Sequence, residues 1–85
     1  MRLDLEFYGP LRDRIGHARR SVEIDGAPAS RGDLVAHLAQ EMDTAGHLSD
    51  PRLRLAVNDE IVPAGGALDL KDGDRIAFLS PFSGG

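Results

Sequence analysis

Apolar and polar residues alternate with a period of two along several short stretches of the chain. Near the start, Leu3, Leu5 and Phe7 alternate with charged neighbours, which is typical of a half-buried β-strand. Further along, Asn58-Asp59 is a tight-turn sequence between two such stretches. The pattern predicts five strands, over residues 2–8, 19–25, 52–57, 61–62 and 75–79.

One long helix is predicted between the second and third strands. Its apolar residues recur at helical spacing and form one stripe, made of Leu34, Val35, Leu38, Ala39 and Met42. Ser30 suits the N-cap, the helix is expected to run to about Ala45, and Gly46 suits the position just beyond its end. A single helical turn is expected earlier, where Leu11 and Ile15 lie four residues apart.

The order of these elements predicts the fold class. One amphipathic helix cannot bury its own apolar stripe, so it must lie on one face of a mixed sheet whose other face meets water. The first and last strands alternate most regularly, and we place both at the centre. This α+β layout is the β-grasp, or ubiquitin-like, roll. We expect one such domain over residues 1–81 and a flexible tail over residues 82–85.

Composition narrows the chemistry that is open to the chain. It has 85 residues, no cysteine and a formal net charge of −4. The lack of cysteine excludes disulfides, thiolate zinc sites, iron–sulfur clusters and a catalytic thiol. The negative charge disfavours nucleic acids, whose phosphates require a clustered basic face. Since no long apolar run or signal region is found, we expect a cytoplasmic protein that binds neither nucleic acid nor membrane.

The side chains carry no recognisable catalytic or metal-binding set. The histidines lack the spacing of a metal site on one helix; they are His17, His37 and His47. An acidic cluster near the last turn lacks the terminal Glu of a calcium loop; it consists of Asp69, Asp72 and Asp74. Phosphate-loop and nucleophile-elbow motifs are absent. We therefore expect no bound metal or cofactor.

The remaining candidate for chemistry is the C-terminus, Gly84-Gly85. Its carboxylate is a nucleophile able to attack the α-phosphorus of ATP and form an acyl-adenylate. Glycine has no Cβ, so two in a row can thread a narrow channel in a partner. Pro81 lacks an N–H group and therefore ends the last strand. The alternative is a frayed tail without function, but the β-grasp pattern directly upstream favours function. If the protein carries sulfur, no cysteine thiol can hold it, and the carboxylate of Gly85 is the acyl position left for it.

Over its whole length the sequence resembles the MoaD/ThiS sulfur carriers, ubiquitin-like proteins that end in Gly-Gly. Residues 9–13 resemble the family's opening after a Phe-containing strand, and residues 56–58 its mid-chain hairpin. Residues 70–85 are similar to the small subunit of molybdopterin synthase, with a DGD turn, a hydrophobic strand, a Pro-containing arm and Gly-Gly. Where that subunit commonly has Pro-Pro-Val, this chain has Ser80, Pro81 and Phe82.

The resemblance implies a sulfur carrier that works with other proteins. An ATP-dependent adenylyltransferase of the ubiquitin-activating type would adenylate Gly85, and a cysteine desulfurase or rhodanese-like donor would convert it to a thiocarboxylate. In the molybdopterin branch, the tail enters the large synthase subunit within a heterotetramer. There it donates sulfur to cyclic pyranopterin monophosphate during molybdenum cofactor biosynthesis. The catalytic side chains then belong to the large subunit, and the activating enzyme uses the ATP.

We expect the partner to bind the sheet face away from the helix. By strand alternation, Leu79 and Ala77 point away from the core, and Leu79 forms an apolar patch with Phe82 beside the tail. The alternatives are a scattered surface position for Leu79, a lock of Phe82 onto its own domain, and a solvated role for Arg12. The expected partner-binding residues are Leu79, Pro81, Phe82, Ser83 and Arg12, with Gly84 and Gly85 as the reacting end.

Three other functions stay open at this point. The same carrier chemistry serves thiamine, cysteine or thiolated tRNA. A ubiquitin-like modifier would instead join Gly85 to a lysine of a target protein; Lys71 is the only lysine of the chain itself. The third alternative is a plain interaction domain, in which the tail has no role.

Overall fold

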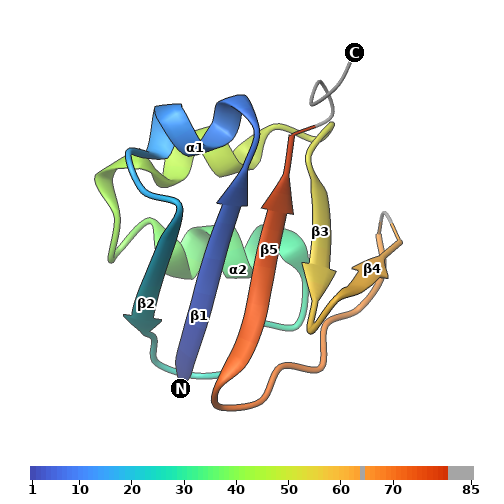
Figure 1. The fold of residues 1–85 in the computed structure, drawn as a ribbon. Helices are drawn as coiled ribbons and strands as arrows, with labels where there is room; N and C mark the ends of the chain where they lie inside the picture. The colour runs from blue at the N-terminus through green and yellow to red at the C-terminus, as the bar shows by residue number, and fades with distance from the viewer. Residues whose placement is uncertain (64, 81–85) are drawn as a thin grey trace.

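The computed structural model describes residues 1–63 and 65–80. They form one five-stranded sheet with strand order β2-β1-β5-β3-β4, and the helices lie on one of its faces (Figure 1). The strands are β1 (Arg2–Tyr8), β2 (Arg19–Glu23), β3 (Arg54–Val57), β4 (Glu60–Val62) and β5 (Asp74–Leu79). The helices are α1 (Pro10–Ile15), α2 (Arg31–Leu38) and the 3₁₀ helix η1 (Asp43–Ser49). This is the β-grasp roll, so the predicted fold class and the central positions of β1 and β5 are confirmed.

The pairing of the strands determines where the chain ends. β1 is antiparallel to β2 and parallel to β5, whereas β3 is antiparallel to both β5 and β4. Parallel strands end at the same edge of a sheet, so the last residue of β5, Leu79, lies opposite Tyr8, the last residue of β1. α1 begins directly after this edge, at Pro10. β5 therefore ends at the edge of the sheet where α1 begins.

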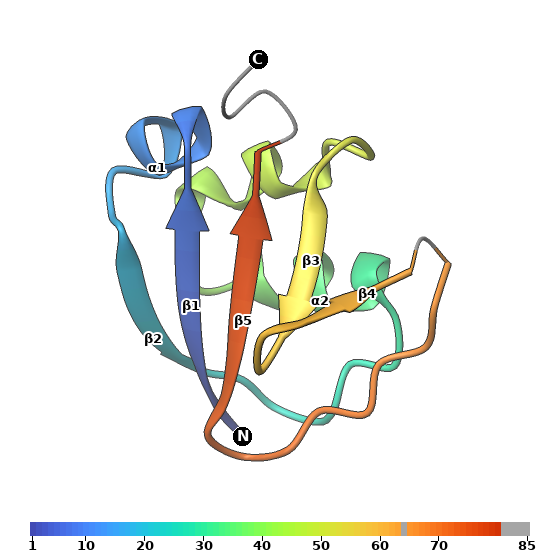
Figure 2. The same ribbon diagram turned by 45° about the vertical axis from the view of Figure 1, so that its right-hand side comes forward.

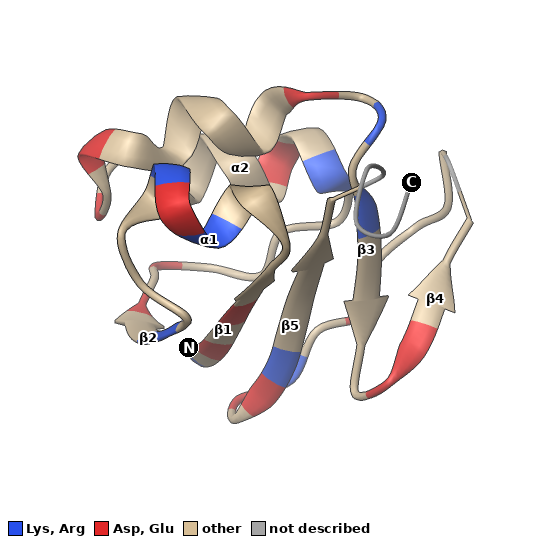
Figure 3. Ribbon diagram, turned by 45° about the horizontal axis from the view of Figure 1, so that its top comes forward, with Lys and Arg blue, Asp and Glu red and all other residues tan. Residues whose placement is uncertain are grey.

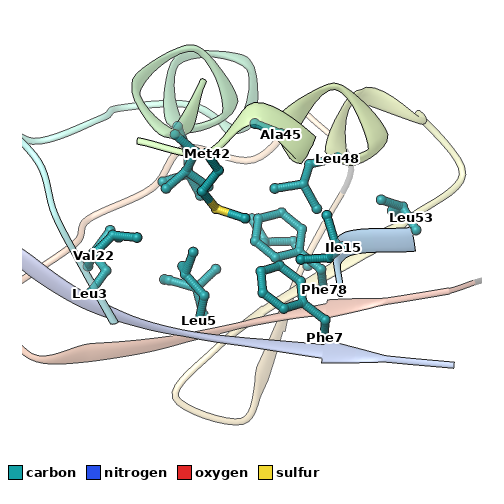
Figure 4. Packing of buried hydrophobic residues seen from close by; sticks show 14 of the residues in the cluster. Leu3, Leu5, Phe7, Ile15, Val22, Met42, Ala45, Leu48, Leu53 and Phe78 are labelled. Carbon is teal, nitrogen blue, oxygen red and sulfur yellow. The ribbon is translucent and has the colours of Figure 1, made fainter. Parts of the chain in front are cut away.

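The core lies between the sheet and the helices. Alternate residues of the two central strands point into it and are almost fully buried: Leu3, Leu5, Phe7, Ile76 and Phe78. The rings of Phe7 and Phe78 stack with their centroids 5.8 Å apart. Met42 lies over them from the helical layer (Figure 4). Burying each such side chain contributes roughly 1.5–3 kcal/mol to the free energy of folding. The apolar residues that alternate along these strands are therefore the main source of stability.

The predicted helix is wrong in its second half. α2 ends at Leu38, Met42 has an extended backbone (φ −138°), and a 3₁₀ helix follows in place of the α-helix. Gly46 consequently lies inside η1, and Ala39 is exposed. The apolar residues of η1, Ala45 and Leu48, are three residues apart and both buried, a spacing that suits three residues per turn. Asp43, Thr44 and Gly46 are weak α-helix formers, which favours the change.

The tight turns and strand limits agree closely with the sequence pattern. Asn58 and Asp59 both have positive φ, 49° and 72°, as a type I′ hairpin turn between β3 and β4 requires. The second and third strands are shorter than predicted, since β2 ends at Glu23 and β3 begins at Arg54. Ile24 and Leu53, just outside these strands, are still buried. In the described part of the chain, no helix has the length and apolar character needed to cross a membrane.

Candidate functional site

The candidate site lies at the edge of the sheet where β5 ends. The residues on which the sequence prediction depends most, Pro81, Phe82, Ser83, Gly84 and Gly85, lie outside the described residues. The boundary between domain and tail stays a prediction for the same reason. What the structure shows is the surface from which this segment departs, beginning with Leu79 and the buried Ser80.

Leu79 lies on the outer face of the sheet, away from the helices. Its neighbours toward the core, Ile76 and Phe78, are fully buried, whereas Leu79 is half-buried. The strand register places Tyr8 on one side of Leu79 and Arg54 on the other. Tyr8 is 46% exposed, which leaves an aromatic ring on this surface. Leu79 therefore has the orientation that strand alternation predicts; its role in binding stays a prediction.

A second row of outer-face residues continues this surface across the sheet. Ala77 lies opposite Ala56, and Ala56 lies opposite Ile61. Ala56 is buried although it points outward, because its side chain is small and lies between two strands, while Ile61 is 53% exposed. We call the combined surface the outer apolar strip; it consists of Tyr8, Leu79, Ala77, Ala56 and Ile61.

Sequence reasoning missed both ends of the outer apolar strip. Tyr8 occupies a polar position of the first alternating stretch, and Ile61 belongs to a return strand too short to show a period. The available signal was the pairing of strands: once β3 and β4 are joined by a two-residue turn, Ile61 must fall opposite Ala56. Tyr8 and Ile61 are the large apolar residues that remain exposed in the described structure.

Arg12 is brought to the same end of the sheet as Leu79. It is an exposed residue of α1, the helix that begins where β1 ends. Figure 3 shows basic segments both on α1 and at the start of β3, whose first residue is Arg54. Neither Arg12 nor Arg54 makes an ion pair with any residue that the structure describes. Both charges are therefore available to a partner.

An ion pair strengthens the loop before β3. Two bonds from the Arg52 side chain, at 3.1 and 2.9 Å, hold the carboxylate of Asp50. This side-chain hydrogen bonding, the backbone N–H of Arg52 and the nearby charges of Arg52 and Arg14 lower the pKa of Asp50 to about 2. Asp50 is thus ionised at neutral pH. Its single negative charge pairs with Arg52 and does not neutralise the other arginines at this end of the sheet.

Asn58 connects the β3–β4 turn to the start of β5. Its side-chain amide donates to Asp74 at 3.0 Å, and its side-chain oxygen accepts from the backbone of Arg75 at 3.0 Å. The bond from Asn58, followed by one from the backbone N–H of Lys71, lowers the pKa of Asp74. The Ala-Val-Asn sequence therefore has a structural function here, which is to align the hairpin with β5.

The described side chains contain no metal centre. Among residues 1–63 and 65–80, no group of three or more His, Asp or Glu residues is placed to hold a metal ion. His37 forms a hydrogen bond with the backbone of its own helix, in which Nδ1 lies 2.8 Å from the carbonyl oxygen of Asp33. What the site offers is an apolar surface with arginines beside it, at the point where a segment ending in Gly-Gly departs.

Comparisons with known proteins identify the family. The model of the ThiS family matches residues 5–85. The chain is 36% identical over 84 residues to the molybdopterin synthase sulfur carrier subunit of Haemophilus influenzae, covering 98% of this chain and 99% of that protein. Among solved structures, it is 27% identical (TM-score 0.63, 100% of both chains covered) to a chain in the complex of subunits 1 and 2 of the molybdopterin-converting factor from Helicobacter pylori.

A second solved structure with high similarity is SAMP1 from Haloferax volcanii, with 25% identity, a TM-score of 0.67 and 100% of both chains covered. The family match spans nearly the whole chain, includes the C-terminal Gly-Gly, and agrees with the β-grasp fold described above. The chain therefore belongs to the ThiS family, the MoaD/ThiS type of ubiquitin-like sulfur carriers.

Proposed function

We propose that this chain carries sulfur as a thiocarboxylate on Gly85 and donates it to cyclic pyranopterin monophosphate, as the small subunit of a molybdopterin synthase. The observation that carries the proposal is the 36% identity, along almost the entire length of both proteins, to a molybdopterin synthase sulfur carrier subunit. The outer apolar strip beside the departing C-terminal segment supports it, because a carrier of this kind needs a docking surface next to its reacting end.

Loading the sulfur requires three substitutions, at the α-phosphorus of ATP, at the acyl carbon of Gly85 and at a disulfide sulfur. The carboxylate attacks the α-phosphorus of ATP on an activating enzyme, and pyrophosphate leaves. The terminal sulfur of a donor persulfide then attacks the acyl-adenylate, and AMP leaves. A thiol cleaves the resulting disulfide and releases the thiocarboxylate. ATP, the adenylyltransferase and the cysteine desulfurase or rhodanese-like donor belong to the partners; we place the reaction in the cytoplasm and expect no resident cofactor on this chain.

The outer apolar strip is the proposed docking surface for the large synthase subunit. Exposed Ile61 and Tyr8 and half-buried Leu79 provide apolar area that water covers in the free chain. The Helicobacter pylori relative has been solved as a complex of its two subunits, which supports a partner of this kind. In the assembly that we propose for this chain, the large subunit would supply the catalytic side chains, and this chain would be both subunit and co-substrate.

Intact mass spectrometry tests the carrier chemistry. After incubation with ATP, the activating enzyme and a sulfur donor, the mass should rise by the exchange of one oxygen for one sulfur, localised to the C-terminal peptide. Deletion of Gly85, or one added residue that cannot be trimmed, should abolish the change. If the activating enzyme loads its known carrier but leaves this chain unmodified, the proposal fails.

A second experiment identifies the sulfur acceptor. Conversion of cyclic pyranopterin monophosphate by the loaded chain with a large subunit would distinguish this acceptor from those of thiamine, cysteine and tRNA thiolation.

Protein modification is a second candidate, favoured by the similarity to SAMP1, a small archaeal modifier protein. Here the Gly85 acyl group would form an isopeptide bond with a lysine of a target. Attachment of one copy to another would use Lys71 or the amino group of Met1, which donates to the carbonyl of Ile24 at 2.8 Å and to Glu23 at 3.2 Å. A Gly-Gly remnant on target lysines after proteolysis would support this function, and its absence would oppose it.

A further inference from the structure

A groove of about 730 Å³ lies on the helix side of the sheet, at its β4 edge. It is bounded by the N-terminal half of α2, the loop before β3, and the β3–β4 hairpin. Figure 2 shows α2 lying behind β3 and β4, with β4 diverging from the rest of the sheet. β4 has three residues and ends at Val62, directly before Pro63, so it covers little of the inner face next to β3. This groove lies apart from the outer apolar strip except at its rim.

The floor of the groove is apolar. It is formed by side chains from four different elements: Leu48 of η1 and Leu55 of β3 are buried, and Val35 of α2 and Val62 of β4 are partly buried against the core. Val35 and Val62 therefore present apolar surface that no described element covers. A volume of this size lies within the range of ligand sites in proteins, roughly 300–1,000 Å³.

The wall of the groove is basic although the protein is acidic overall. Arg31, Arg52 and Arg54 line it, and no Asp or Glu is found among its described lining residues, in a chain with 14 acidic and 10 basic residues. The guanidinium of Arg31 is fixed by the carbonyl oxygens of Leu53 and of Asp50, the latter at 2.6 Å. These bonds use two of its five N–H groups. The carboxylate of Asp50 neutralises one positive charge, through its pair with Arg52.

We propose that this groove binds a segment of a partner protein in which an apolar side chain is flanked by carboxylates. The apolar floor accommodates the anchor, and Arg31 and Arg54 bind the acids. A protein segment fits better than a free small molecule because Ile61 and Arg54 belong both to the groove lining and to the outer face of the sheet. A partner docked on the outer face can therefore continue around the β4 edge into the groove.

A peptide titration followed by amide NMR tests the proposal. The sample is the full chain enriched in ¹⁵N. The probe is a capped hexapeptide, Glu-Asp-Ile-Leu-Asp-Glu. We expect saturable shifts at the amides of Gly32, Val35, Val62 and Gly66, with an affinity that falls as salt is added. Arg54→Glu should weaken binding by about tenfold or more, since it replaces an attraction with a repulsion. Arg19→Glu, with the same charge change on β2 at the far side of the sheet, should leave the affinity within about twofold.

Two control peptides separate the contributions of charge and apolar anchor. Lysines in place of the acids should abolish the shifts, and serines in place of Ile-Leu should weaken binding by about tenfold or more. Well-dispersed spectra of both arginine variants establish that they are folded. The proposal is overturned by the absence of saturable groove shifts, by equal effects of Arg54→Glu and Arg19→Glu, by equal binding of the lysine peptide, or by shifts confined to Tyr8, Ala77 and Leu79.

Discussion

Leu79 occupies a surface position between two buried neighbours in the chain, Phe78 and Ser80. The pleat of β5 turns its side chain to the outer face, where it lies between Tyr8 and Arg54. A charge placed there would meet water in the free chain but an apolar surface in the complex that we propose. A change at Leu79 should therefore have little effect on folding and a large effect on that association.

We predict that Leu79→Asp weakens binding to the large subunit by about 2–4 kcal/mol, because a carboxylate would be buried without a partner. The free energy of unfolding of the isolated chain should fall by only about 1 kcal/mol or less, since Leu79 is half-buried outside the core. Calorimetric titration measures the first quantity and urea denaturation the second. Phe78→Ala is the matched control: as a buried core residue, it should destabilise the fold by about 3–5 kcal/mol. A large loss of stability in Leu79→Asp would contradict the assigned face.

At the reacting end, the predicted requirement is the absence of a Cβ. Gly84→Val should leave the thermal midpoint of the domain unchanged but block adenylation or transfer, because a branched side chain would clash with the walls of a narrow channel. Mass spectrometry of the product and thermal unfolding measure the two effects. Normal thiocarboxylate formation and normal transfer by the folded variant would rule out the threading argument.

At the scale of elements, periodic segments were predictable and aperiodic ones were not. The alternation of Leu3, Leu5 and Phe7 describes β1 correctly, because one face of the strand is buried along its whole length. The sequence pattern misplaces the end of α2 because Ala45 and Leu48, within the 3₁₀ helix, and Met42, just before it, are all buried, as they would be in a continuous α-helix. Burial periodicity alone therefore does not distinguish the two.

The β3–β4 hairpin gives a test at this scale. Asn58→Ala should lower the free energy of unfolding by about 1–3 kcal/mol, because it removes two side-chain hydrogen bonds and a residue type that tolerates positive φ. Glu60→Ala, an exposed neighbour on β4, should change it by less than about 0.5 kcal/mol. Urea denaturation of both variants measures the difference, and equal stabilities would show that Asn58 does not align the hairpin.

For the whole molecule, the sequence predicts the arrangement of helices on one face of a mixed sheet, but only part of the exposed apolar surface. The outer apolar strip combines residues from four strands. Tyr8 becomes a neighbour of Leu79, and Ile61 a neighbour of Ala56, only through strand register. The groove at the β4 edge depends in the same way on the short length of β4. Surfaces assembled across strands require the pairing to be known, whereas the core requires only the alternation within each strand.

Acid stability is a property of the whole fold that the aspartates allow us to predict. Asp50 and Asp74 both have lowered pKa values when folded, about 2 for Asp50 against an ordinary 3.8. A carboxyl group of this kind stabilises the fold above its unfolded-state pKa and loses that contribution as the pH falls through its folded pKa. Stability should therefore decline between about pH 4 and pH 2, and Asp50→Asn should decline less steeply there. Urea midpoints across this range provide the test, with Asp43→Asn, an exposed residue of η1, as control. Identical slopes for Asp50→Asn and the parent chain would contradict the prediction.

The parallel pairing of β1 and β5 also has a mechanical consequence. Six residue pairs join the two strands, from Leu3 with Asp74 to Tyr8 with Leu79. The N-terminus lies at one end of this pair, and β5 ends at the other (Figure 1). A force that pulls on the C-terminal segment while the opposite end of the domain is held loads these hydrogen bonds in shear, so that many must break together. A partner enzyme that pulls the tail into its channel would therefore strain its own contacts with this chain before the domain unfolded.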